Sequence, residues 1–433
     1  MKSARAGSVT SKTVTSKTRD ANRIANRLLS RLLSRLLVTA AACAALLFAG
    51  ACGGGGSSPT PTPTPVSGSN VQAIEVNLGP AGNYANGAFT SVTVCTPGTT
   101  TCQTIDGVLV DTGSSGLRLL SSALTVSLTQ QKAPDGNPVV ECLPFVSTYT
   151  WGPVQTADIE IAGEKASSAP IQVLSDSDYP VPAQCSNNNG TSQDSLSALG
   201  ANGILGISVF PQDCGSSCVS TGASNPGLYY ECPASGCVVT GESLAQQVQN
   251  PVVLFSTDNN GVIIELPASA TPEATLSGSL IFGIGTQSNN ALNGATVYGV
   301  DQYGNFITTY HNTAYNQSFL DSGSNGFYFL DSTTAGIPAC SDANYFYCPS
   351  ATENLSATNA GSTGTPTGTV TFSVANADNL FNNYPNASVY GQLAGPNSIA
   401  GFDWGLPFFY GRNVYTAIDG QSTPGGKGPY WAY

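Results

Sequence analysis

From residue 71 onward, the chain alternates short apolar runs with polar segments that carry glycine, proline and asparagine. The runs are rich in valine, isoleucine and threonine, and several alternate apolar and polar positions, as β-strands with one buried face do. The clearest of them are 71–78, 88–95, 103–110, 156–163 and 260–266. The pattern predicts an all-β protein.

Few segments show helical periodicity, and the best candidate helix is 241–249. Two stretches rich in small polar residues, 176–200 and 341–368, predict long loops. Because 433 residues exceed one ordinary domain, the length is compatible with two lobes or one long β fold, and we expect two β lobes. The N-terminal lobe would span 71–258 and the C-terminal lobe 259–433.

The charge distribution separates the start of the chain from the rest. Nine of the 14 basic residues precede residue 52, where only Asp20 opposes them, so the remainder holds 25 acidic and 5 basic residues. A body this acidic would repel the phosphates of nucleic acid and of anionic lipids. We therefore expect no nucleic-acid partner.

The basic start runs into an apolar stretch of about signal-peptide length, so residues 1–51 predict a signal peptide. Cys52 and the Gly/Ser- and Pro/Thr-rich tether that follows it, residues 52–70, resemble a bacterial lipoprotein signal with Cys52 as the lipidated residue. Residues 49–51 also suit an ordinary signal peptidase, so a secreted or periplasmic protein is the alternative. Both routes predict export to the cell envelope, with the lipid as the only membrane contact.

Twelve cysteines occur, and ten remain when Cys43 in the signal and Cys52 are set aside. An even number in an exported chain favours disulfides over zinc, and His311 is the only histidine. We expect no metal and no other cofactor. Sequence does not determine the connectivity, but proximity suggests the pairs Cys95–Cys102, Cys214–Cys218, Cys232–Cys237 and Cys340–Cys348, which leaves Cys142–Cys185.

A ten-residue segment is repeated: "DTGSSGLRLL" occupies 111–120 and "DSGSNGFYFL" occupies 321–330, each after an apolar run. An Asp followed by a small hydroxyl residue and Gly predicts a carboxylate in a tight turn at the end of a strand. If the two turns meet about a pseudo-two-fold axis, the carboxylates cannot both ionise, so one keeps its proton. Such a pair can act as general base and general acid around one water molecule.

These segments resemble the two signatures of the pepsin-like aspartic peptidases. The resemblance continues in "NGILGISVF" (202–210) and "GFDWGLPFFYGRNVYTAIDG" (401–420), which are similar to the strands beneath the family's aspartate turns. It covers 71–433 and implies the bilobal acid-protease fold, with two pseudo-two-fold-related β lobes and a cleft between them. Because both turns lie in one chain, we expect a monomer. The chain is also similar to a bacterial group of exported proteins of unknown function related to these peptidases.

The resemblance implies that Asp111 and Asp321 are catalytic carboxylates that activate a water molecule to hydrolyse a peptide bond. The substrate would be a peptide or an unfolded protein that lies extended in the cleft. The residues that would support the dyad are Thr112, Gly113, Ser114, Ser322, Gly323 and Ser324.

One departure from the family concerns the flap, the hairpin that covers the cleft. Arg118 stands where the family has a Trp that supports a flap tyrosine, and we expect Arg118 to pair with an acidic residue instead. The flap is expected in 147–163, with Tyr149 or Trp151 as its aromatic residue. The departure leaves an alternative function open, a catalytically silent envelope protein that binds peptides or glycans in the cleft.

Overall fold

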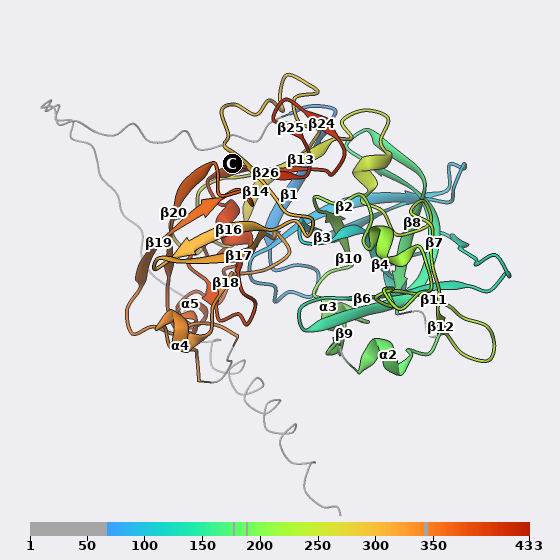
Figure 1. Cartoon of the computed structure of the whole chain (residues 1–433), viewed down its shortest axis with the longest axis horizontal. Coiled ribbons are helices and arrows are strands. Elements are labelled where there is room, and N and C mark those ends of the chain that lie inside the picture. The colour runs from blue at the N-terminus through green and yellow to red at the C-terminus, as the bar shows by residue number, and fades with distance from the viewer. Residues whose placement is uncertain (1–66, 176–177, 188, 342–344) are drawn as a thin grey trace, which may run out of the picture. The chain divides into compact units, whose positions relative to one another are not determined.

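The computed structural model describes residues 67–433 apart from 176–177, 188 and 342–344 (Figure 1). The described residues belong to one compact unit. The expected signal peptide, Cys52 and the tether up to residue 66 lie outside the described residues. In the part of the chain that the structure describes, no helix is both long and apolar enough to span a membrane.

Six antiparallel strands connect the two halves of the chain. β1 pairs with β14, and the ladder continues through β13, β23 and β26 to β15. The strands are β1 (Val71–Asn77), β13 (Gly261–Leu266), β14 (Leu276–Phe282), β15 (Val297–Gly299), β23 (Arg412–Ala417) and β26 (Tyr430–Ala432). Because β1 also pairs with β2, the ladder is continuous with the strands of the N-terminal half.

The N-terminal half consists of short strands with small helical turns between them. The strands are β2 (Gly87–Cys95), β3 (Cys102–Asp111), β4 (Ser115–Leu120), β5 (Thr129–Gln130), β6 (Val139–Pro144), β7 (Thr148–Ile161), β8 (Glu164–Leu174), β9 (Thr191–Ser192), β10 (Gly203–Ile207), β11 (Tyr229–Glu231) and β12 (Val238–Val239). The helices are α2 (Ala183–Ser186) and α3 (Leu196–Leu199), with 3-10 turns η1 (Ser121–Ala123), η2 (Gly215–Cys218) and η3 (Pro251–Leu254).

The C-terminal half contains a seven-stranded sheet in the order β20-β19-β16-β17-β22-β18-β21, drawn in orange and red in Figure 1. Its strands are β16 (Phe306–Tyr310), β17 (Thr313–Leu320), β18 (Phe327–Phe329), β19 (Glu353–Ala360), β20 (Thr367–Val374), β21 (Ala394–Gly395) and β22 (Phe402–Trp404). The pair β24 (Ser422–Thr423) and β25 (Gly426–Lys427), the helices α4 (Ser332–Ala335) and α5 (Ala377–Asn383), and the 3-10 turn η4 (Leu406–Phe409) complete this half.

The same local arrangement occurs once in each half. In the first, β10 lies parallel to β3 and antiparallel to β4. In the second, β22 lies parallel to β17 and antiparallel to β18. Each copy therefore places one strand beneath the turn that carries an aspartate. The all-β prediction, with two related β lobes, is confirmed.

Two local predictions are wrong. Residues 241–249 form turns rather than a helix, because tertiary contacts hold them: the Gln247 side chain bonds Gly215 and Glu242, and the Val248 amide donates to the Tyr229 hydroxyl. The expected loop 341–368 contains β19, whose polar residues pair with β20 over eight positions. Its composition resembles that of a loop because much of the strand is exposed.

The four disulfides suggested by proximity, Cys95–Cys102, Cys214–Cys218, Cys232–Cys237 and Cys340–Cys348, are present, and so is the remaining pair Cys142–Cys185. Four of them join cysteines that are eight or fewer positions apart in sequence, whereas Cys142 and Cys185 are 43 positions apart. This longer bridge ties β6 to α2, so it anchors one strand of the β6–β7 hairpin.

Candidate active site

Two aspartates stand at equivalent points of the repeated arrangement. Asp111 ends β3 opposite Gly206 of β10, and Asp321 follows β17, where its amide donates to the carbonyl of Trp404 in β22. Each aspartate directly follows a buried apolar residue, Val110 before Asp111 and Leu320 before Asp321, and both of these residues belong to the main core. The core thus fixes the backbone from which each carboxylate projects.

Reciprocal hydrogen bonds lock the two turns together. The Thr112 hydroxyl donates to the carbonyl of Leu320 at 3.0 Å and accepts from the Ser322 amide at 2.9 Å. The Ser322 hydroxyl donates to the carbonyl of Val110 at 2.8 Å and accepts from the Thr112 amide at 3.1 Å. All four groups are buried, so the exchange satisfies polar atoms that water cannot reach.

The glycines of both turns face the opposite carboxyl group. A Cβ atom on Gly113 would lie 2.7 Å from Asp321 Cγ, and one on Gly323 would lie 2.6 Å from Asp111 Oδ1. Any larger residue would push the carboxyl groups apart. The amides of Gly113 and Gly323 each donate to the aspartate of their own turn at 2.8 Å.

The carboxyl groups of Asp111 and Asp321 interact directly, and this interaction governs their chemistry. Burial raises the pKa of Asp321 well above its usual value, and the neighbouring carboxyl groups of Asp111 and Asp403 and a hydrogen bond with Asp111 raise it further. Ser114 donates to Asp111 Oδ2. Ser324 Oγ lies 2.8 Å from Asp321 Oδ2. The arrangement favours one shared proton between the two acids, the state that general acid–base chemistry requires.

Asp403 is a third acid that the sequence analysis did not single out. It lies in β22, is 5% exposed, and its Oδ2 lies 2.7 Å from Ser324 Oγ. Burial raises the pKa of Asp403 to about 8. The sequence did contain a signal for it: the segment "GFDWG" has an acid, Asp403, at the position where the equivalent segment of the first half has the apolar residue Ile204.

The tip of the β6–β7 hairpin, residues 145–147, lines three cavities, each of which is also lined by residues of the aspartate turns. Their volumes are about 400, 570 and 330 Å³, and the first and third are lined by both Asp111 and Asp321. Val146 at the tip is 81% exposed and lines all three. The hairpin therefore contributes an apolar edge beside the two acids.

The two expected flap aromatics lie in this hairpin but do not line those cavities. Tyr149 and Trp151 are buried against Cys142, Cys185 and Tyr230, and the Trp151 indole donates to the carbonyl of Tyr179. The aromatic residue that the tip presents to the cavities is Phe145.

Tyr84 is a second residue that the sequence analysis missed. It lines two of the cavities together with Ser324 and Asn325. Burial raises the pKa of its hydroxyl, and the charges of Asp111 and Asp321 add to this effect. Tyr84 lies in a loop before β2 with no motif of its own, so its position depends on tertiary structure alone.

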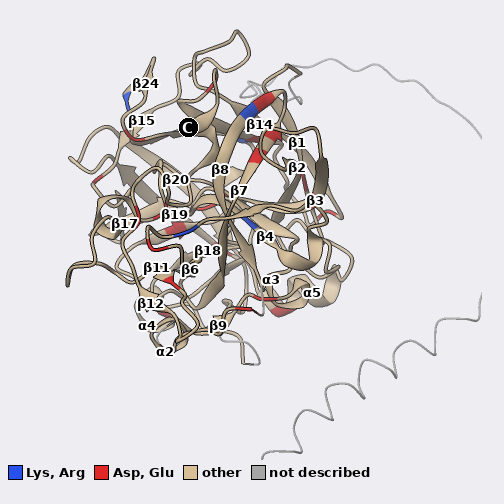
Figure 2. Ribbon diagram, turned by 90° about the vertical axis from the view of Figure 1, so that its right-hand side faces the viewer, with Lys and Arg blue, Asp and Glu red and all other residues tan. Residues whose placement is uncertain are grey.

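Arg118 pairs with acidic residues, as expected. It is fully buried and contacts Glu141 Oε1 at 2.8 Å and Asp213 Oδ2 at 3.1 Å. The Tyr229 hydroxyl donates to Asp213, and burial together with the charge of Glu141 raises the pKa of Asp213. The cluster joins β4, β6 and the loop after β10, so it fixes the base of the hairpin. Figure 2, in which Lys and Arg are blue and Asp and Glu are red, shows that basic residues are few.

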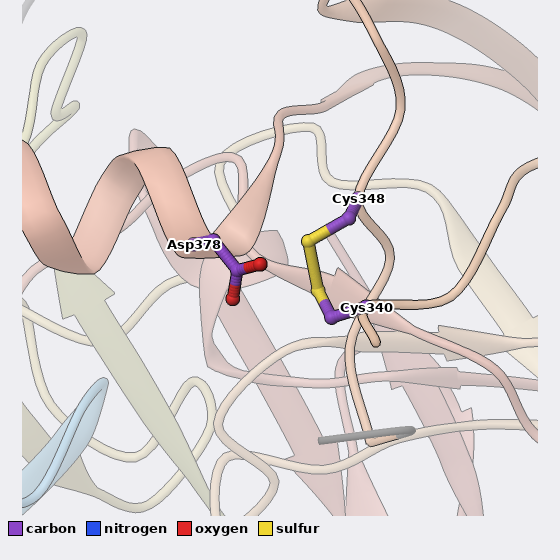
Figure 3. Close-up of side chains that lie close together, drawn as sticks. All are labelled: Cys340, Cys348 and Asp378. Atoms are coloured by element: carbon purple, nitrogen blue, oxygen red, sulfur yellow. A yellow bond between two sulfur atoms is a disulfide. The ribbon is translucent and has the colours of Figure 1, made fainter. Parts of the chain in front are cut away.

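One set of side chains within the described residues has the spacing of metal ligands: Cys340, Cys348 and Asp378 (Figure 3). The two cysteines form a disulfide, so their sulfurs are not thiolates. His311 is exposed and stacks on Tyr310, with ring centroids 4.0 Å apart.

Comparisons with known proteins give two similarities. Among solved structures, the chain is similar to an aspartic proteinase from Irpex lacteus, with 15% identity, a TM-score of 0.46, and coverage of 84% of this chain and 96% of that one. A comparison with curated proteins found no match. Residues 66–433 match the family described as "Protein of unknown function (DUF3443)". The chain therefore belongs to the DUF3443 family.

Proposed function

We propose that this protein is an aspartic-type endopeptidase that uses Asp111 and Asp321. The observation that carries the proposal is the direct approach of the two carboxyl groups across the interlocked turns, with each glycine facing the opposite acid. The ionised acid takes a proton from a bound water, which attacks the peptide carbonyl, while the protonated acid donates to the carbonyl oxygen. The acid that took the water proton then gives it to the amide nitrogen, the C–N bond breaks to release an amine and a carboxylic acid, and the other acid recovers its proton from a hydroxyl of the tetrahedral intermediate.

The cavities around the dyad support binding of an extended peptide. The hairpin tip lines all three, and their lining includes apolar and aromatic side chains such as Phe145, Val146 and Tyr84. Cavities of this kind accept successive side chains, and strand edges pair with the peptide backbone. We propose an unfolded protein or flexible peptide as the substrate.

We further propose that the protein acts in the cell envelope as a monomer, tethered by lipid at Cys52. The basic and apolar start of the chain, the tether and the ten paired cysteines support this location. Labelling with a radioactive fatty acid in a bacterial host, compared between the natural chain and Cys52→Ser, tests the anchor. Equal labelling of both chains would contradict it.

Binding of a statine-type peptide distinguishes an active peptidase from a catalytically silent protein that only binds peptides. Such compounds imitate the tetrahedral intermediate, so a dyad with one proton binds them at least about a hundredfold more tightly than a matched peptide. We expect this preference in the natural chain and its loss in Asp321→Asn. Equal affinity for both compounds would favour the silent peptide-binding alternative.

A further inference from the structure

Ser324 stands between two carboxyl groups. Its hydroxyl oxygen lies 2.8 Å from Asp321 Oδ2 and 2.7 Å from Asp403 Oδ2. A hydroxyl group has one proton to donate, whereas an ionised carboxylate can only accept. Two ionised carboxylates therefore cannot both be bonded to Ser324, and one of the two acids must supply a proton.

The surroundings of Asp403 select it as the donor. Its Oδ1 is buried without a hydrogen-bond partner, an arrangement that costs far less for the carbonyl oxygen of a neutral acid than for a charged carboxylate. The ion pairs of the described residues are made by Arg118 and Lys165, and none involves Asp403. Burial raises its pKa to about 8.

The titratable groups that surround Asp403 cannot neutralise a carboxylate. They are Asp321 beside β17, Tyr328 in β18, Asp111 at the end of β3, and Tyr84 from the loop before β2. Each of them is either neutral or negatively charged. Ionisation of Asp403 would therefore add a further negative charge to a buried site that already has two acids.

The first half of the chain has no equivalent acid. β10 pairs Ile204 with Leu109 two residues before Asp111, and β22 pairs Asp403 with Phe319 two residues before Asp321. Asp403 thus occupies the position of Ile204 in the repeated arrangement. The asymmetry gives Asp321, and not Asp111, a second acid behind its serine.

We propose that Asp403 is a positioning residue, a neutral carboxylic acid that donates to Ser324 and thereby directs the Ser324 proton to Asp321. The inference rests on the proposed peptidase function. It assigns the C-terminal half a fixed hydrogen-bond chain, Asp403 to Ser324 to Asp321, that adds no charge to the dyad.

Two substitutions distinguish this role from a purely structural one. Asp403→Asn keeps a neutral donor of the same shape, so we expect kcat within about threefold of the natural enzyme and an unchanged pH profile. Asp403→Leu imitates Ile204 and leaves Ser324 without a donor, so we expect kcat to fall about tenfold or more with little change in KM. If Asp403 were ionised, Asp403→Asn would remove a negative charge and move both limbs of the profile to lower pH. That displacement, or full activity of Asp403→Leu, would overturn the proposal.

Infrared spectroscopy tests the protonation state without reference to activity. At about pH 6, where exposed carboxyl groups are ionised, a buried neutral acid still shows the C=O stretch of a protonated carboxyl. We expect the natural chain to show one such band that Asp403→Asn lacks. Absence of this difference overturns the proposal even if the protein is an active peptidase. A band without peptidase activity would overturn the proposed function but preserve the neutral acid.

Discussion

Thr112 and Ser322 each donate a side-chain hydrogen bond to a backbone carbonyl of the opposite half and each accept one from the other's amide. The two residues are 210 positions apart, and they occupy the same place in the two repeated turns. Because the exchange is reciprocal and buried, it fixes the distance between the aspartates that precede them.

Removal of the Thr112 hydroxyl should therefore destabilise the protein. Thr112→Ala leaves the Ser322 amide and the Leu320 carbonyl buried without this partner, at a cost of about 2–4 kcal/mol in the free energy of unfolding. Thr112→Ser keeps the hydroxyl and should lose less than half as much. Urea unfolding of both variants measures the difference, and equal stability of the two would contradict the role of the hydroxyl.

The glycine that faces the opposite acid should be intolerant of a methyl group. In Gly113→Ala the added Cβ lies 2.7 Å from Asp321 Cγ, so the carboxyl groups must separate. Displacement by about 1 Å at a reacting group costs on the order of a hundredfold in rate, and we expect kcat/KM to fall at least that much. Gly222→Ala is the matched control, since the nearest atom to its added Cβ is 3.8 Å away. Comparable activity of the two variants would exclude the close approach.

The Arg118 cluster should show a large effect on stability. Arg118→Met leaves Glu141 and Asp213 buried without their cation, which costs about 3–5 kcal/mol. Adding Glu141→Gln and Asp213→Asn removes the uncompensated charge and should restore more than half of that loss. Thermal unfolding of the single and triple variants measures both steps. A triple variant no more stable than the single one would show that packing, rather than charge, explains the cost.

The pH dependence of stability should reveal Asp403. An ordinary Asp has a pKa of about 3.9, and burial raises that of Asp403 to about 8 in the folded protein. Between these values the folded state binds more protons than the unfolded state, so stability falls as pH rises. Relative to Asp403→Asn, the natural chain should lose up to about 5 kcal/mol between about pH 4 and 8. Parallel stability curves for the two proteins would contradict the raised pKa.

The repeated turns made much of the site predictable from sequence. Asp111 and Asp321 each follow a short apolar run at the end of a strand, and the sequence Asp-Thr/Ser-Gly at that point favours a tight local turn. The disulfides were predictable for a similar reason, because four of the five join cysteines that are close in sequence. Sequence patterns were therefore sufficient to predict the features that depend on residues close together in the chain.

Residues placed by tertiary packing could not be found in this way. Tyr84 and Asp403 reach the dyad because β1–β2 and β22 fold beside it. Tyr84 lies in no motif, and Asp403 lies within a recognised segment at a position where the first half has the apolar residue Ile204. The hairpin was expected near the observed segment. The strand register, in which Pro144 pairs with Tyr149, places the tip at 145–147 and thereby decides which aromatic residue faces the cavities. The helix expected at 241–249 failed because Gln247 and Val248 are held by partners far away in sequence.

The most direct test of the account is cleavage of an unfolded protein by the purified chain from residue 53 onward, between about pH 2 and 7, where paired carboxyl groups titrate. Asp111→Asn and Asp321→Asn should each abolish cleavage. The control is Asp106→Asn, since Asp106 is an exposed acid on the same strand as Asp111. We expect activity in the natural chain and in the control, and none in either dyad variant. Cleavage that survives in a dyad variant, or absence of cleavage by the folded natural chain at every pH, would contradict it.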